Sequence, residues 1–278
     1  SDSSGGAAIA AYNIYLAQKR MGLDVKFLCY EKKKEDDNVV QIRQNFISSK
    51  IHQYKKGIDR RIMKFFINDR HTSYSTGLFK LNLKNIISEI NPDIINIHWI
   101  NSSMISIKEF SSLKKYKIFW TLHDMWPFCA TEHYSLNNYY ETGYLKKNFF
   151  DINNFIFKKK IKYFPKNINI IAPSEWIKLT AQKSLIFKNS KFKKIHHAID
   201  ENKWVLNNKA KSKDLLGLSK YKNIILFGAE RGISMRRKNF SFLEKVLKHL
   251  KFISYKDTCI AVFGGSKLED TIKKNYTI

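Results

Sequence analysis

Cysteine is scarce in this chain, and its few cysteines stand far apart. The 278 residues contain only Cys29, Cys129 and Cys259, which are separated by a hundred residues or more and form no C-x-x-C pair. This spacing indicates neither a disulfide framework nor a cysteine zinc site. We therefore expect a protein of a reducing compartment, the cytoplasm.

Long apolar runs and a leader sequence are also missing. No stretch of 18 or more apolar residues occurs, and no signal-peptide pattern opens the chain, so we expect no membrane-spanning helix. Residues 1–6 have the composition of a loop and do not begin with Met, which predicts that the natural protein starts earlier. Since 44% of the residues are hydrophobic and 27% are charged, the chain can bury a core and is not expected to be disordered.

Acidic residues are few beside the basic ones. Lysine and arginine number 50 against 24 aspartates and glutamates, a net charge of +26. This excess favours polyanions such as nucleic acid, anionic lipid headgroups or phosphorylated small molecules. It also has a plain explanation, because lysine is scattered along the whole chain together with abundant asparagine and isoleucine. No zinc-finger, RRM or basic-zipper pattern occurs, so we expect no nucleic-acid partner; a basic surface would help a peripheral protein bind anionic membrane.

Short apolar segments alternate with helical patterns, which predicts a parallel sheet covered by helices on both faces. After an initial helix at 7–20, strands are expected at 25–30, 93–98, 117–122, 168–172 and 192–197. Further helices are expected at 60–68, 78–90, 104–115, 151–164 and 174–187. The fold class predicted for the chain is therefore α/β.

The character of the chain changes at residues 200–219, which are polar and linker-like. A second alternation follows, with a strand at 223–227, a helix at 240–250 and a strand at 259–263. Two strands and one helix do not complete an α/β domain. We therefore predict a first domain at residues 1–200, followed at residues 201–278 by a linker and the start of an incomplete second domain.

Ligands of open parallel sheets bind at the carboxyl ends of the strands, and polar residues follow several predicted strands. These residues are Gly5 and Gly6 at the start of the first helix, His98, His123 with Asp124, Ser174, and the basic cluster Arg231, Arg236, Arg237 and Lys238. Glycines and free helix N–H groups suit close approach of an anion, and arginine and lysine bind phosphates. A tight turn at the glycines and a solvated basic loop are the structural alternatives.

The segment Trp120–Pro127 is the most informative, because a polar pair follows an apolar strand within an aromatic stretch. An imidazole can act as acid, base or hydrogen-bond donor near neutral pH. His123 is therefore the candidate catalytic residue, with Asp124 as the group that could orient it, and a purely structural histidine is the alternative. A metal site with His98 and His133 is conceivable, but no i, i+4 or H-E-x-x-H spacing supports one.

The predicted helix at 151–164 combines aromatic residues with a run of lysines. Such a helix could lie on a membrane surface. We favour the alternative, a helix that packs its aromatic side chains into the core and exposes its lysines to solvent.

Four stretches occur in an order that resembles glycosyltransferase family 4, in particular the branch of colanic-acid and related cell-surface polysaccharide transferases. They are Ser4–Ala8, Ile95–Asn101, Trp120–Phe128 and Ala172–Trp176. The resemblance covers essentially all of the chain, and its most specific part is the stretch of tryptophan, histidine and aspartate. It implies the GT-B fold, in which an N-terminal Rossmann-like domain binds the acceptor and a C-terminal one binds the nucleotide sugar.

The resemblance also implies an activity. A protein of this kind is a retaining glycosyltransferase of the hexosyltransferase type, which moves a sugar from a nucleotide-sugar donor to a glycan or lipid-linked acceptor in bacterial surface polysaccharide synthesis. It works in the cytoplasm, and a basic surface would allow peripheral contact with the inner face of the membrane. Such enzymes generally need no metal or other cofactor.

Carried over residue by residue, the resemblance assigns three groups of site residues. His123 would lie at the reacting sugar as the catalytic residue. The residues near the donor phosphates would be Gly5, Gly6, Arg231, Arg237 and Lys238. The residues of the acceptor side or the cleft would be His98, Asp124 and Ser174.

Several departures from the family pattern bear on these assignments. Relatives commonly have Lys-Gly where this chain has Lys238-Asn239, and an arginine where it has Ala229, a role that Arg231 would take over. Where relatives have Asn-Gly before the segment between the domains, this chain has His197-Ala198. Relatives often have a glycine- and cysteine-rich stretch after Trp-Pro, and here that stretch is Cys129–Glu132, so no metal cluster is expected.

The pair of glutamates typical of the family has no counterpart and would lie beyond Ile278, and the first strand is also missing. We therefore expect a chain truncated at both ends that is inactive or marginally stable by itself. The alternative is a noncatalytic remnant that keeps only the acceptor-binding domain. A basic nucleic-acid-binding protein is a weaker alternative.

Overall fold

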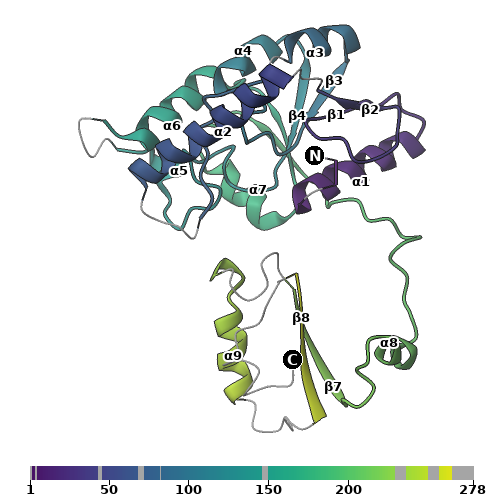
Figure 1. The fold of residues 1–278 in the computed structure, drawn as a ribbon. Helices are drawn as coiled ribbons and strands as arrows, with labels where there is room; N and C mark the ends of the chain where they lie inside the picture. Colours follow the sequence, from purple (N-terminus) through teal and green to yellow (C-terminus); the bar gives the residue numbers. More distant parts are fainter. Residues whose placement is uncertain are drawn as a thin grey trace. The chain divides into compact units, whose positions relative to one another are not determined.

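The structure is a computed structural model that describes residues 2–3, 5–42, 46–67, 72–81, 83–145, 150–228, 236–249 and 257–264 (Figure 1). The chain divides into two compact units, Ser1–Asp200 and Glu201–Ile278. Every paired strand of the named sheets runs parallel to its neighbour. The predicted α/β class is therefore confirmed.

The first unit is organised around a four-stranded parallel sheet with the order β3-β4-β5-β6. Its strands are β3 (Ile94–Ile97), β4 (Lys117–Thr121), β5 (Asn169–Ala172) and β6 (Lys191–Lys194). Each overlaps a predicted strand. β3, β4 and β5 are rich in isoleucine or aromatic residues, which fit a pleated, half-buried surface, whereas β6 carries three lysines and Phe192. All four strands run in the same direction, so their carboxyl ends lie at one edge of the sheet.

A second, two-stranded sheet in the same unit pairs β1 (Phe27–Cys29) with β2 (Val39–Gln41). The sequence predicted β1, although longer, and did not predict β2, which lies in a charged stretch. The bond between the Tyr15 hydroxyl and Asp36, at 2.7 Å, ties that stretch to the first helix. Val39 is almost fully buried beside Tyr15, which explains why three residues form a strand here.

Seven α-helices in the described part of the first unit surround these strands (Figure 1). They are α1 (Gly6–Arg20), α2 (Phe46–Phe66), α3 (Lys84–Ile90), α4 (Phe110–Leu113), α5 (Tyr139–Thr142), α6 (Ile152–Tyr163) and α7 (Glu175–Gln182). The helix predicted at 60–68 is much longer as α2. No helix in the part of the chain that the structure describes is both long and apolar enough to cross a bilayer.

Two predicted helices are shorter than expected, for local reasons. The helix expected at 78–90 begins only at Lys84, after the buried Leu81 and Leu83. The helix expected at 104–115 is reduced to the 3₁₀ turn Ile107–Glu109 and α4. Ser106 has extended backbone and forms a capping box with Glu109, so the helical segment starts after it.

The core of the first unit is built on Trp120 of β4, which is almost completely buried. Its ring stacks on Phe110 with centroids 5.1 Å apart, and Phe164 lies at 5.3 Å. Phe110 belongs to α4 and Phe164 ends α6, so both helices are held against the sheet by the same indole. Offset aromatic packing of this kind adds to the burial of large apolar surfaces.

The segment that follows β4, residues 122–133, is buried at every position except His123, which is half-buried. Loops usually lie on the surface because their backbone polar groups need water. Here side chains take the place of water. The Ser184 hydroxyl donates to the Phe128 carbonyl at 2.9 Å, the Tyr144 hydroxyl accepts from the Ala130 amide at 3.2 Å, and the Glu132 carboxylate accepts from the Thr131 amide at 3.0 Å.

Lys160 of α6 completes the bonding of this segment. Its ammonium donates to the carbonyls of Cys129, at 3.0 Å, and Trp126, and it lies 3.6 Å from the centre of the Trp126 ring. Burial lowers the pKa of Lys160 to about 7, against the raising effect of nearby acidic groups. The aromatic packing predicted for this helix is found at Phe157, but the expectation that its lysines are solvated is wrong for Lys160.

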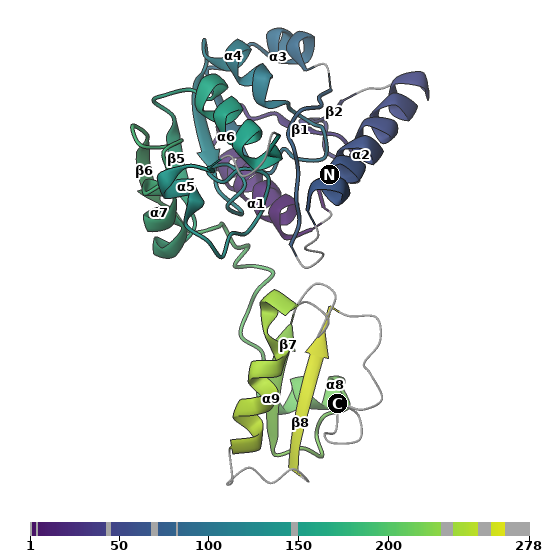
Figure 2. The same ribbon diagram turned by 90° about the vertical axis from the view of Figure 1, so that its left-hand side faces the viewer.

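The second unit contains α8 (Lys209–Leu215), β7 (Asn223–Gly228), the 3₁₀ turn Arg236–Lys238, α9 (Phe240–His249) and β8 (Thr258–Phe263) (Figure 2). β7 and β8 are parallel and pair Ile225 with Ile260. Phe240, Leu247 and Ile260 form its small core. The stretch expected to be a linker contains α8, which begins after Asn208 because that side chain accepts from the Lys211 amide at 3.1 Å.

Gly77 offers a test of the packing around the buried segment. Its φ is +66°, and a Cβ placed on it would lie 2.6 Å from Cζ2 of the buried Trp126 ring. We expect Gly77→Ala to lower the free energy of unfolding by about 2–4 kcal/mol, because it combines a left-handed backbone with a clash in the core. Chemical denaturation measures this difference.

Gly57→Ala is the matched control. Gly57 lies within α2, and a Cβ there meets no atom within 4 Å. It should raise the free energy of unfolding by about 0.5–1 kcal/mol, since alanine favours a helix over glycine. Equal stability of the two variants would contradict the packing described for Gly77.

Candidate active site

His98 and His123 meet at the carboxyl edge of the four-stranded sheet. His98 follows β3 directly and His123 comes two residues after β4, and these strands are neighbours with Ile97 opposite Trp120. Nδ1 of His98 and Nε2 of His123 lie 2.9 Å apart and share a hydrogen bond. Two histidines that are 25 residues apart in sequence are thus brought together by strand pairing alone.

A third imidazole extends this pair. His197 lies three residues beyond β6, and its ring stacks on that of His123 with centroids 5.0 Å apart and an interplanar angle of 12°. Nδ1 of His197 is buried without a hydrogen-bond partner among the described residues. In the sequence, His197 stands out only as a departure from a family pattern; its place at the carboxyl end of the predicted strand 192–197 was the signal that could have identified it.

The three imidazoles are uncharged at neutral pH. Burial, with the neighbouring imidazoles acting in the same direction, lowers the pKa of His98 to about 3. Burial and His197 lower the pKa of His123 to about 4, although Asp124 acts against them. The pKa of His197 is also lowered, again mainly by burial. In a hydrogen bond between two neutral imidazoles, one ring donates and the other accepts.

The direction of that bond decides what His123 offers to a ligand. If His98 donates through Nδ1, the proton of His123 resides on its own Nδ1, which then acts as a donor. With the opposite direction, Nδ1 of His123 is an acceptor. In both cases His98 is the hydrogen-bond partner that fixes the state of His123, and the partly exposed ring of His123 can contact a bound molecule.

The prediction that Asp124 orients His123 is wrong. Asp124 is buried, and its Oδ2 accepts from Nδ1 of His133 at 2.6 Å and from the Trp99 indole nitrogen at 3.0 Å. Its Oδ1 accepts from the Trp126 amide at 3.1 Å. His133 in turn contacts the Ser75 hydroxyl through Nε2 at 3.0 Å. The Asp124 carboxylate therefore positions Trp99 and the buried segment, and it does not orient His123.

His98 and His133, considered together for a metal, belong to different clusters. His98 is bonded to His123, whereas His133 is bonded to Asp124 and Ser75. Within the described ranges, no group of three or more histidine, cysteine, aspartate or glutamate side chains is arranged to hold a metal ion.

Gly5 and Gly6 form the N-terminal end of α1. Gly5 is the residue before the helix and has a φ of 88°, a conformation that glycine adopts without strain. A Cβ on Gly5 or Gly6 would meet no atom within 4 Å, and no acidic residue occupies the first turn. α1 also approaches the end of β6, because Nδ2 of Asn13 donates to the Ala198 carbonyl, one residue after His197, at 3.2 Å.

Ser174 follows β5 and caps α7, since its side chain accepts from the Ile177 amide at 3.4 Å. This contact confirms Ser174 as the cap of the helix predicted at 174–187, so the side chain has a structural role. In the second unit, Arg237 and Lys238 are exposed in the turn before α9. Arg231 lies outside the described residues.

Asn239, at the position where relatives commonly have glycine, has a φ of 56°. Asparagine tolerates the left-handed conformation better than most residues. Asn239 therefore adopts the backbone conformation that a glycine would adopt at this position, and the turn that carries Lys238 can form.

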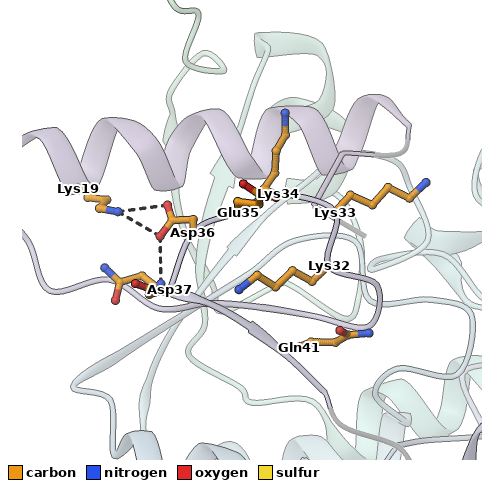
Figure 3. A pocket seen from close by; sticks show the side chains of 9 residues that line it. Lys19, Lys32, Lys33, Lys34, Glu35, Asp36, Asp37 and Gln41 are labelled. Carbon is orange, nitrogen blue, oxygen red and sulfur yellow. Dashed lines mark hydrogen bonds and ion pairs between the residues drawn. The ribbon is translucent and has the colours of Figure 1, made fainter.

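A hollow of about 970 Å³ lies beside α1 and is lined by the segment that follows β1 (Figure 3). Its wall mixes both charge signs, with Lys19, Lys32, Lys33 and Lys34 facing Glu35, Asp36 and Asp37. Lys19 pairs with Asp36 at 3.1 Å. Because the acidic side chains offset the basic ones, this wall is poorly suited to an anion, and no predicted site residue lines it.

Comparison with known proteins gives the chain its family. The family description Glycosyltransferase Family 4 matches residues 4–203, more than two thirds of the 278 residues. Neither the curated proteins nor the solved structures gave a match. The matched region spans the sheet with the three histidines, and the parallel α/β units agree with Rossmann-like domains of the GT-B class. The chain belongs to glycosyltransferase family 4.

Proposed function

We propose that this glycosyltransferase is a retaining enzyme that moves a hexose from a nucleotide-sugar donor to a glycan or lipid-linked acceptor. The observation that carries the proposal is the hydrogen-bonded pair of His98 and His123 at the carboxyl edge of a parallel sheet. Open α/β sheets bind their ligands at this edge. A family match over the same unit supports the assignment to sugar transfer.

The chemistry explains why a neutral imidazole suits this place. Cleavage of the bond between the sugar and the diphosphate builds positive charge on the sugar and negative charge on the leaving group. A protonated histidine beside the sugar would oppose the first of these changes. The lowered pKa values of His98 and His123 keep the pair uncharged, so that His123 can hydrogen-bond a sugar hydroxyl and hold the sugar in place.

The glycine pair at α1 is proposed to approach the donor phosphates or the acceptor. Nothing within the described chain requires Gly6 to lack a side chain, because a Cβ there meets no atom within 4 Å. A ligand that comes close to the backbone would require it. The free N–H groups and the dipole of a helix N-terminus favour an anion, and the first turn holds no acidic residue that would compete.

The departing diphosphate is proposed to bind cations of the second unit. Arg237 and Lys238 are exposed on the turn before α9, and Arg231 precedes them in the sequence. Positioned cations that stabilise developing negative charge are among the largest contributions to catalysis. In this proposal these side chains stabilise the leaving group without a metal.

The proposed setting is bacterial surface polysaccharide synthesis in the cytoplasm. The net charge of +26 supports peripheral contact with the anionic inner face of the membrane, since basic residues near such a surface are attracted to it. His98, Asp124 and Ser174 remain assigned to the acceptor side of the site, although Asp124 and Ser174 act through the side chain and helix that they hold.

His123→Ala tests the catalytic role. A screen of nucleotide sugars on the full-length protein, scored by release of nucleoside diphosphate, first identifies the donor. We then expect the variant to lower turnover by about 100-fold or more, with binding of the nucleoside diphosphate unchanged, because His123 contacts the sugar and not the phosphates.

His249→Ala, at the exposed end of α9, is the control and should leave turnover unchanged. Full turnover by His123→Ala would refute the assigned role. Failure of every nucleotide sugar to release nucleoside diphosphate would refute the proposed function itself.

A further inference from the structure

We propose that Trp99 is a stacking platform for a pyranose ring of the acceptor. The inference rests on the proposed function and adds a binding residue to it. Trp99 follows His98 directly, at the carboxyl end of β3, and 42% of its surface is exposed. Its neighbour His98 is bonded to His123, so a ring stacked on Trp99 lies next to the imidazole pair.

The indole of Trp99 is held in place although 42% of the residue's surface is exposed. Its nitrogen donates to Oδ2 of Asp124 at 3.0 Å, and its ring lies 5.8 Å from that of His133 at 35°. Asp124 is held in turn by His133, which contacts Ser75. A chain of buried polar groups therefore holds an exposed aromatic ring in one orientation.

A fixed and partly exposed indole is better suited to binding a sugar than to stabilising the fold. Because 42% of its surface is exposed, Trp99 gains less from packing than the buried Trp120 and Trp126 do. The apolar face of a pyranose can stack on an indole, while the hydroxyls around the ring reach polar groups nearby, the combination found in small-molecule sites. A platform that is already fixed loses little conformational entropy on binding.

Trp99 differs from the other exposed tryptophans. Trp176 and Trp204 are more exposed than Trp99, at 59% and 70%. Of these three, only Trp99 has a hydrogen-bonded indole nitrogen within the residues that the structure describes. The fixed orientation is therefore a property of this position and not of exposed tryptophans in this chain.

The loop that carries Trp99 is also strained. Ser102 and Ser103 have φ values of 60° and 64°, a left-handed conformation that costs residues other than glycine about 1–2 kcal/mol each. Asn101 is buried, and its Oδ1 has no hydrogen-bond partner in the described part of the chain. Strain and unsatisfied polar groups concentrate at ligand sites, which supports a binding role for this loop.

The direct test is binding of simple sugars without nucleotide, observed through the indole N–H signals by NMR. The wild-type protein is titrated with methyl glycosides of glucose, galactose, mannose and N-acetylglucosamine. The Trp99 signal, assigned with Trp99→Phe, should shift and saturate with at least one of them. Trp99→Ala should weaken binding of that glycoside by about tenfold, and Trp99→Phe should weaken it less because a ring remains.

Phe65→Ala removes an exposed aromatic ring of α2 (82% exposed) and should leave glycoside binding unchanged. The inference is overturned if no glycoside shifts the Trp99 signal, or if Trp99→Ala binds the same glycoside as tightly as the wild type. Either result refutes sugar stacking on Trp99 but not the proposed function, provided that the full-length wild-type protein releases nucleoside diphosphate from a nucleotide sugar. If the full-length wild-type protein releases none, the proposed function itself is refuted.

Discussion

The hydrogen bond between His98 and His123 is the interaction on which the candidate site depends. It exists because β3 and β4 are parallel neighbours in register, so that the residues after them meet at one edge. Burial keeps both rings neutral, which allows one to donate to the other instead of repelling it. The ring of His197, three residues after β6, stacks on that of His123.

The buried segment 122–133 is what makes this edge rigid. A loop that carries a functional residue is commonly exposed and mobile, but here Lys160, Ser184, Tyr144 and Glu132 bond its backbone from within the core. Asp124 extends the same network outward to Trp99. The scaffold therefore fixes both the imidazole and the indole, as the proposed sugar site requires.

The strands of the main sheet could be predicted, and so could the places of His98 and His123 at the carboxyl ends of strands, because apolar runs are local patterns and parallel sheets bind ligands at that edge. The contact between the two histidines was not predicted, since it depends on which strands are neighbours. β2 and most of α2 were missed, since charged residues there obscure a periodicity that tertiary packing stabilises. The partners of Asp124, the burial of Lys160 and the stacking of His197 depend on contacts between segments far apart in the chain. No spacing within one sequence encodes those contacts.

The charge state of the imidazole pair decides whether burial keeps His98 and His123 neutral, as the candidate site requires. NMR of protein with ¹⁵N-labelled histidine, with signals assigned through His98→Gln and His123→Gln, reports whether each ring nitrogen carries a proton. At about pH 5.5 an ordinary histidine, with a pKa near 6.5, is mostly charged. The account predicts that His98 and His123 are still neutral there, because their pKa values are about 3 and 4; titration of either ring near 6.5 would contradict it.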